Sequence, residues 1–292
     1  MQRGARFRLY GVKMPSIASQ RPLAVSPAPA PSQPQASPMK PAFLLGALTL
    51  CGASLTAQAK LSDWPQHSEE RPKPRVVQPG APFTIAPPSD ATILFDGRSL
   101  DRWMSDSLGA AARWRVADGA FIAVPGSGTL RTRDGFGDVQ LHIEWATPSP
   151  AVGSGQDRGN SGVFFANGRY EVQVLDSYNN ATYADGQAAA LYGQFPPMVN
   201  VSRAPGEWQA YDIVYRRPRF GSGGALQSAA RLTVFHNGVL VQDNMELVGP
   251  TANRKRPPYS AHPDRLPISL QDHGHPVRFR NVWLRDLERA PQ

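Results

Sequence analysis

Residues 159–177 have the sequence GNSGVFFANGRYEVQVLDS, and the interpretation of the whole chain starts from this stretch. It contains two runs of β-forming residues, 163–166 and 169–175, on either side of Asn167 and Gly168. An Asn-Gly pair between such runs is the strongest short-range hairpin signal, because a type I′ turn requires a positive φ at both central residues. The stretch therefore predicts two antiparallel strands joined by a tight turn.

The second strand of this hairpin carries polar side chains in its middle. With a period of two, Tyr170, Val172 and Val174 share one face, while Glu171 and Gln173 project from the other. The two polar side chains are expected roughly 6.5–7 Å apart, at ~3.3 Å rise per residue. A carboxylate beside an amide favours a face that meets a ligand, and a solvated sheet face is the alternative.

The signals of short strands recur along the chain. Asp118-Gly119 and Asn237-Gly238 mark two more hairpins, and residues 138–146 alternate between apolar and polar side chains. No amphipathic helix of three turns stands out. Many short strands separated by Gly and Pro predict an all-β fold, a sandwich or jelly roll of antiparallel sheets.

Residues 178–206 show little periodicity and hold scattered aromatic side chains among Gly and Asn. A loop of this length inside a compact domain is usually functional, so a flap that covers a ligand is one interpretation. The other is that Tyr192 and Phe195 simply cover the edge of a sheet.

The formal charge of +8 does not indicate nucleic-acid binding. Residues 1–59 contain six basic residues and no acidic one, so +8 minus 6 leaves only +2 for the rest of the chain. A nearly balanced domain lacks the basic footprint that nucleic acids require. We therefore expect no nucleic-acid partner.

The N-terminal region has the pattern of an export signal. Residues 39–59 begin with Met39 and Lys40, continue with an apolar stretch and end in a small-x-small site, as a signal peptide does. The apolar stretch is too short to span a bilayer comfortably, so no membrane span is expected. Residues 1–38 are then a disordered leader or a mis-called start. Attachment as a lipoprotein through Cys51 is the alternative, but the residues before it fit poorly.

The mature chain is expected to have two parts. Residues 60–90 are rich in Pro and charge and predict a linker or an arm on the surface, and residues 91–288 predict the folded domain. Export would place the protein in the periplasm or outside the cell. Cleavage after Ala59 would leave no cysteine, so no disulfide would stabilise the domain.

Polar side chains suggest a site on the predicted sandwich. No Gly-rich phosphate loop, cysteine metal motif or GxSxG elbow is present. Glu171 and Gln173 form one polar file, and Gln271 and His273 form a second at the same period of two. On one concave sheet these files would place an acid, an imidazole and two amides in one cleft, and an acid with an imidazole can move protons near neutral pH.

Other polar residues admit a simpler interpretation. His142 and Glu144 share the polar face of their strand, and they could join the cleft or face water. His236 lies directly before a hairpin turn, where a surface position is expected.

Seven segments resemble the 3-keto-disaccharide hydrolase family, which has a concanavalin A-like jelly roll of two antiparallel sheets. In order they are LFDGRSLDRW, GNSGVFF, YEVQVLDS, LYGQFPP, EWQAYDIVYR, VFHNGVLVQD and LQDHGHPVRFRNVWLR, within residues 91–287. The resemblance implies a sugar site on the concave sheet. The residues that it places on recurring family motifs are Asn160, Glu171, Gln173, Asp176, Tyr192, Gln271 and His273.

The resemblance implies cleavage of 3-keto-glycosides by removal of the C2 proton, elimination of the aglycone and hydration. The base is then Glu171 or His273, and the acid is the other of the two or Asp176. Substrate contacts are assigned to Asn160, Gln173, Tyr192, Gln271 and Glu144. The sequence requires no cofactor, although a divalent metal could hold the keto and enolate oxygens, with Glu171, Asp176 and His273 as suitable ligand types.

Two other classes of function remain open at this stage. A non-catalytic carbohydrate-binding module would use Tyr183, Tyr192 and Phe195 as an aromatic platform, and Glu171 would only bind hydroxyl groups. A structural or cell-surface domain would use the Pro-rich arm for interactions. Only the enzyme needs a pair of groups that transfer protons.

Overall fold

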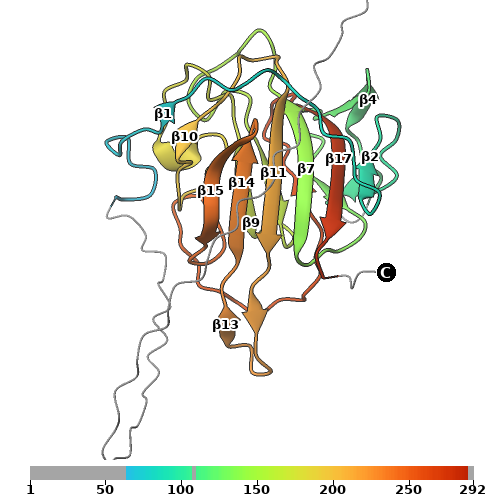
Figure 1. Ribbon diagram of the computed structural model, residues 1–292, viewed down its shortest axis with the longest axis vertical. Coiled ribbons are helices and arrows are strands. Elements are labelled where there is room, and N and C mark those ends of the chain that lie inside the picture. The colour runs from blue at the N-terminus through green and yellow to red at the C-terminus, as the bar shows by residue number, and fades with distance from the viewer. Residues whose placement is uncertain (1–63, 107–109, 289–292) are drawn as a thin grey trace, which may run out of the picture. The chain divides into compact units, whose positions relative to one another are not determined.

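The computed structural model describes residues 64–106 and 110–288, and within these ranges the chain is almost entirely strand and loop (Figure 1). The strands are β1 Arg75–Val76, β2 Thr92–Phe95, β3 Trp103–Ser105, β4 Arg115–Ala117, β5 Ala120–Ile122, β6 Leu130–Thr132, β7 Val139–Ala146, β8 Ser161–Phe165, β9 Tyr170–Val174, β10 Val199–Asn200, β11 Gln209–Arg216, β12 Arg219–Phe220, β13 Leu226–Ser228, β14 Arg231–His236, β15 Val239–Glu246, β16 Ser269–Leu270 and β17 Arg278–Asp286. In these ranges the helical structure is limited to one 3₁₀ turn, η1 Ala184–Gly186.

Two antiparallel sheets contain most of these strands. The larger has eight strands, in the order β15-β14-β11-β7-β17-β5-β4, with β2 also paired to β17. The smaller has five, in the order β3-β6-β16-β8-β9. In Figure 1 the larger sheet faces the viewer and β9 of the smaller sheet lies behind it. The predicted all-β sandwich of two antiparallel sheets is confirmed.

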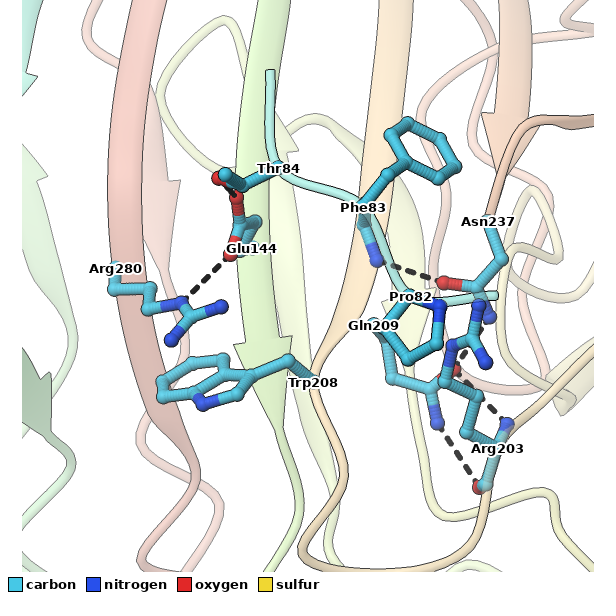
Figure 2. A pocket seen from close by; sticks show the side chains of 10 residues that line it. Pro82, Phe83, Thr84, Glu144, Arg203, Trp208, Gln209, Asn237 and Arg280 are labelled. Atoms are coloured by element: carbon cyan, nitrogen blue, oxygen red, sulfur yellow. Dashed lines mark hydrogen bonds and ion pairs between the residues drawn. The ribbon is translucent and has the colours of Figure 1, made fainter. Parts of the chain in front are cut away.

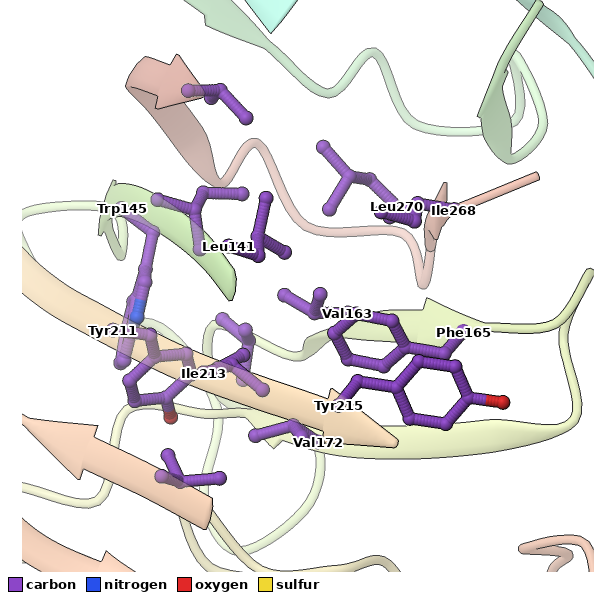
Figure 3. Packing of buried hydrophobic residues seen from close by; sticks show 14 of the residues in the cluster. Leu141, Trp145, Val163, Phe165, Val172, Tyr211, Ile213, Tyr215, Ile268 and Leu270 are labelled. Carbon is purple, nitrogen blue, oxygen red and sulfur yellow. The ribbon is translucent and has the colours of Figure 1, made fainter. Parts of the chain in front are cut away.

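The core fills the space between the two sheets. Strand alternation directs Leu141 of β7 and Tyr215 of β11 toward Val163 and Phe165 of β8 (Figure 3). The rings of Phe165 and Tyr215 stack with their centroids 4.6 Å apart, which joins the sheets through apolar contact. The core therefore fixes which face of each strand points outward.

The hairpin predicted from residues 159–177 forms as β8 and β9. Phe165 pairs with Tyr170, so four residues, 166–169, join the strands where a two-residue turn was predicted, and the Arg169 amide donates to the Phe165 carbonyl at 3.1 Å. Asn167 and Gly168 have the predicted positive φ values, 55° and 84°. Ala166 also has a positive φ of 52°, which the sequence did not indicate. The turn is tied to the chain before β16 by a hydrogen bond from the Asn167 amide to the Pro267 carbonyl, at 2.8 Å.

The segment of residues 64–90 runs as an arm over the domain. Its strand β1 pairs in parallel with β10, and it then crosses the outer face of the eight-stranded sheet to β2 (Figure 1). The Gly80 carbonyl accepts a hydrogen bond from Arg203 and the Ile85 carbonyl accepts one from Asn281, at 2.7 and 2.9 Å. These bonds hold the arm against the sheet.

The predicted leader, signal peptide and lipid attachment at Cys51 all lie outside the described residues, and the domain boundaries stay predictions. Within residues 64–106 and 110–288, no helix is long and apolar enough to cross a membrane.

Candidate active site

A cavity of about 270 Å³ lies on the face of the five-stranded sheet that points away from the core. This volume equals that of about nine water molecules at ~30 Å³ each, which suits one sugar ring better than a chain of them. The lining residues are Asn160, Phe164, Glu171, Gln173, Tyr192, Thr251, Ala252, Asn253, Gln271 and His273. Six of the eight residues predicted to form the site meet here: Asn160, Glu171, Gln173, Tyr192, Gln271 and His273.

A glycine forms the floor of this cavity. Gly162 of β8 pairs with Gln173 of β9 on one side, and its carbonyl accepts the Gln271 amide at 3.1 Å on the other. A Cβ at Gly162 would lie 2.5 Å from Oε1 of Glu171 and 2.6 Å from the ring of Phe164. Because Gly162 has no side chain, there is a space between Gln173 and Gln271, and the carboxyl group of Glu171 lies in it.

Glu171 occupies the middle of β9, and its backbone is fixed from both sides. Its amide donates to Oγ1 of Thr251 at 3.0 Å, and its carbonyl accepts the Tyr192 amide at 3.3 Å. The side chain is only 6% exposed and has no hydrogen bond or ion pair to the rest of the described residues. Burial raises the pKa of Glu171 to about 8, because nothing compensates the lost hydration of the carboxylate.

His273 stands at the exposed rim, on a short turn after β16. The neighbouring Asp272 fixes this turn by accepting the Gly274 amide at 3.0 Å and the Gly128 amide at 2.9 Å. The ring of His273 lies nearly parallel to that of His275, with 6.2 Å between centroids and 6° between planes. The imidazole therefore lies at the solvent-exposed edge of the cavity.

The amide side chains offer directional bonds to hydroxyl groups. Nε2 of Gln173 donates to Gln156 at 3.0 Å, while its Oε1 is buried without a hydrogen-bond partner among the described residues. Nδ2 of Asn160 donates to the Gln156 carbonyl at 2.8 Å. A buried polar atom left unpaired in a cavity is a natural contact for a bound ligand.

The long loop 178–206 both extends the sheet edge and covers the cavity. The amide of Ala189 and the carbonyl of Ala190 bond to Gln173, at 2.9 and 3.0 Å, along the free edge of β9. Tyr192 lines the cavity, and its hydroxyl lies 3.0 Å from that of Tyr183. Phe195 is buried in the core. Tyr183 and Phe195 therefore do not line this cavity, and the aromatic platform expected of a binding module does not assemble here.

Asp176 does not line this cavity. It lies beside a second hollow of about 250 Å³, and its Oδ2 is 2.9 Å from Nε of Arg158 in an ion pair in which Asp176 is buried. Its even number gives it the opposite parity to Glu171, so the strand period does not bring the two together. The ion pair with Arg158 and the position outside the cavity favour a structural role for Asp176 over that of the acid.

Glu144 also lies elsewhere, on the outer face of the eight-stranded sheet under the arm (Figure 2). It accepts bonds from Thr84, from Asn281 at 2.9 Å and from Arg280 at 2.6 Å. Burial alone would raise the pKa of Glu144, but bonds from its neighbours outweigh burial and lower it to about 2. The expectation that it contacts the substrate in the cleft does not fit this position.

Two histidines are more buried than the sequence suggested. His142 neither joins the cleft nor faces water: its Nδ1 lies 2.8 Å from Asp212 and its ring stacks on Trp283. Burial would lower the pKa of His142, but the hydrogen-bonded carboxylate of Asp212 and the carboxylate of Glu144, 3.6 Å from Nε2, raise it to about 9. The surface position expected for His236 is wrong, because the side chain is only 1% exposed and burial lowers its pKa to about 3.

The ligand set suggested for a divalent metal does not gather. Among residues 64–106 and 110–288 there is no group of three or more His, Cys, Asp or Glu side chains that could hold a metal ion. At the cavity, Glu171 and His273 are the available ligands of this kind, and oxygens of the nearby amides could complete a set.

Sequence reasoning missed Thr251, Ala252 and Asn253 as lining residues. They follow the eight-stranded sheet in a loop without periodicity, and their contact with β9 spans about eighty residues of chain. No local pattern could indicate this contact.

The chain matches a family model described as the 3-keto-alpha-glucoside-1,2-lyase-like domain over residues 90–285. It belongs to this family. A crystal structure from Parabacteroides distasonis ATCC 8503, of a protein provisionally assigned as a glycosyl hydrolase, is 43% identical with a TM-score of 0.68. That alignment covers 74% of this chain and 93% of the other. The family and this neighbour support a carbohydrate-acting hydrolase.

A second, provisionally assigned glycosyl hydrolase from Parabacteroides distasonis ATCC 8503 is 20% identical, with a TM-score of 0.50. That alignment covers 68% of this chain and 94% of the other, and at this identity the likeness shows the fold alone. No curated protein matches the chain. The match to the 3-keto-alpha-glucoside-1,2-lyase-like family includes every residue that lines the cavity but begins after most of the arm.

Proposed function

We propose that this protein is an exported enzyme that cleaves 3-keto-glycosides at the cavity containing Glu171. The observation that carries the proposal is a buried carboxyl without a polar partner, with a pKa near 8, in a hollow the size of one sugar ring. A group with such a pKa exchanges protons at neutral pH, as a general base or acid must. Family membership supplies the chemical class.

The first step is an elimination. The 3-keto group acidifies the proton on C2, and Glu171 removes it as the C1–O bond breaks and a C1=C2 double bond forms. His273, at the exposed rim, donates a proton to the departing aglycone oxygen. Placing the base on the floor and the acid at the rim fits a ring that enters with its aglycone toward solvent.

The second step is hydration. Water adds its oxygen to C1 while Glu171 returns the proton to C2, and His273 accepts the second proton of the water. Both groups regain their starting protonation, and the sum of the two steps is hydrolysis. During both steps negative charge develops on the C3 oxygen, and the amide groups of Asn160 and Gln271, which line the cavity, would stabilise it.

A divalent cation is compatible with this site. It would be held by Glu171 or His273 together with amide oxygens, and it would polarise the C3 carbonyl. The steps above require only the residues of the chain.

The test is incubation with 3-keto-trehalose and 3-keto-lactose, with and without chelator, followed by product analysis. We expect release of the aglycone sugar, and a loss of at least about 100-fold in kcat for Glu171→Gln and for His273→Ala. His275→Ala is the matched control for the rim histidine, because His275 stacks beside His273 but does not line the cavity. Near-full turnover by both Glu171→Gln and His273→Ala would refute the assignment.

Export rests on the signal-like residues 39–59 and is a separate part of the proposal. Fractionation of cells that express the full chain should place it in the periplasm or the medium, with Lys60 as the first residue. Retention in the cytoplasm would contradict export and leave the chemistry untouched.

A further inference from the structure

The arm passes directly behind two walls of the cavity. Nε2 of Gln66 donates to the Ala252 carbonyl at 2.6 Å, and the ring of His67 stacks on Tyr183 with centroids 4.1 Å apart and planes at 17°. The ring of His67 also lies 5.2 Å from that of Tyr192. Since Tyr192 and Ala252 both line the cavity, each of these two arm residues contacts a residue of the cavity wall.

The contact between arm and loop is built closely. The His67 amide donates to Oδ2 of Asp185 at 3.1 Å, and the Asp185 carbonyl accepts the Gly193 amide at 2.8 Å. Gly193 directly follows Tyr192, and a Cβ there would lie 1.9 Å from Nε2 of Gln66. Because Gly193 has no side chain, Gln66 of the arm can approach the loop next to Tyr192.

His67 is kept in this position at an energetic cost. Its φ is 62°, in the left-handed region that non-glycine residues seldom adopt. Its Nε2 and Oδ1 of Asp185 are both buried without hydrogen-bond partners among the described residues. A contact that only held the arm in place would not require a residue with a strained backbone and an unpaired buried nitrogen. Backbone strain and unpaired buried polar atoms concentrate at functional sites.

We propose that Gln66 and His67 are positioning residues of the active site, which hold Tyr192 and the Ala252 rim in the geometry that binds the sugar ring. The site then consists of the 3-keto-alpha-glucoside-1,2-lyase-like domain together with an arm that the family match does not include. This inference deepens the proposed function and rests on it for its catalytic consequence.

The kinetic test compares His67→Ala and Gln66→Ala with Phe83→Ala, all in the full chain. Phe83 is on the same arm, but it is 44% exposed and packs near Gly238 on the other sheet. For the two site variants we expect KM for a 3-keto-glucoside to rise by about 10-fold to 100-fold, since small misplacements of binding groups have effects of this size. The Tm should change little, and Phe83→Ala should keep the wild-type KM.

A second measurement does not depend on the substrate. Hydrogen exchange should accelerate at the Tyr192 and Gly193 amides in His67→Ala, because their bonds to Glu171 and Asp185 are held by the arm, and it should not change in Phe83→Ala. If wild type fails to cleave 3-keto sugars but exchange accelerates as expected, the proposed function fails and the positioning role stands. Unchanged exchange, or an unchanged KM in both site variants, would overturn the inference.

Discussion

Replacing Glu171 with Gln removes one titratable group from the cavity floor while keeping its size. In the folded protein burial raises the pKa of Glu171 to about 8, against 4.5 for the unperturbed residue. Between these values the folded state holds a proton that the unfolded state has released. The free energy of unfolding therefore falls as pH rises through this window, and Glu171→Gln lacks this dependence.

The size of the effect follows from the two pKa values. Each unit of difference is worth about 1.36 kcal/mol, and most of the window lies between pH 5 and pH 8. Over that range wild type should lose about 3 kcal/mol relative to Glu171→Gln. The free energies of unfolding of the two proteins should therefore differ least at pH 5. As pH rises, Glu171→Gln should become steadily more stable relative to wild type.

The assay is urea unfolding at half-unit steps from pH 5 to pH 8.5, with Glu207→Gln as the control. Glu207 is exposed, so Glu207→Gln removes one carboxyl from the protein without changing a buried site. Taking differences between proteins cancels the titration of all other groups. A flat difference between wild type and Glu171→Gln would show that the carboxyl is ionised at neutral pH in the ordinary way, and the argument for proton transfer at this residue would fail.

Three further substitutions test the placement of the remaining residues. Gly162→Ala puts a Cβ 2.5 Å from a carboxylate oxygen in the cavity, so kcat/KM should fall at least about tenfold in steady-state assays. Asp176→Asn weakens the pairing of the Arg158 guanidinium and should lower the free energy of unfolding by about 3 kcal/mol in urea, while the folded protein keeps its turnover. Glu144, whose pKa is lowered to about 2, stabilises the fold above pH 4.5 and loses this contribution as pH falls toward 2. Glu144→Gln should therefore be less stable at neutral pH and lose less stability on acidification, as measured by urea unfolding at pH 2.5, 4.5 and 7.

A control variant or a contradicting result is defined for each of these three substitutions. Gly223→Ala is matched to Gly162→Ala, because a Cβ at Gly223 meets nothing within 4 Å, and equal kinetics for the two would mean that the floor tolerates a side chain. Complete loss of turnover in folded Asp176→Asn would show that Asp176 takes part in catalysis. For Glu144→Gln, a stability difference from wild type that does not shrink between pH 7 and pH 2.5 would contradict the lowered pKa of Glu144.

The fold could be predicted because its signals are local. Asn167-Gly168 favours a positive φ at both positions and so marks where the chain reverses, and the alternation on either side fixes which face of each strand meets the core. The same alternation correctly put Glu171 and Gln173 on the face opposite to Val172. Strand parity is dictated by covalent geometry, so it survives whatever surrounds the strand.

The sequence could not indicate which segments of the chain pack against the outer face of a given strand. Glu144 has the expected parity on β7, but parity does not say which sheet β7 joins or that the arm covers its outer face. His236 precedes a hairpin turn as predicted, yet the rings of Trp145 and Tyr211 pack against it and the side chain of Gln209 bonds to it. These contacts join residues distant in the chain, and only the packed fold decides them.

Two buried glutamates, one on each sheet, separate structural from functional charge. His142 lies 3.6 Å from Glu144, and Thr84, Asn281 and Arg280 donate to it. These neighbours lower the pKa of Glu144 to about 2, so it is an anion that fastens the arm. Glu171 is equally buried and has no such donors, and its pKa is raised to about 8. An unpaired buried carboxyl does not stabilise the fold, so an amide or an apolar group at this position would cost no stability. The absence of partners around Glu171 is therefore the stronger argument for chemistry, because the substrate is the partner that the site lacks.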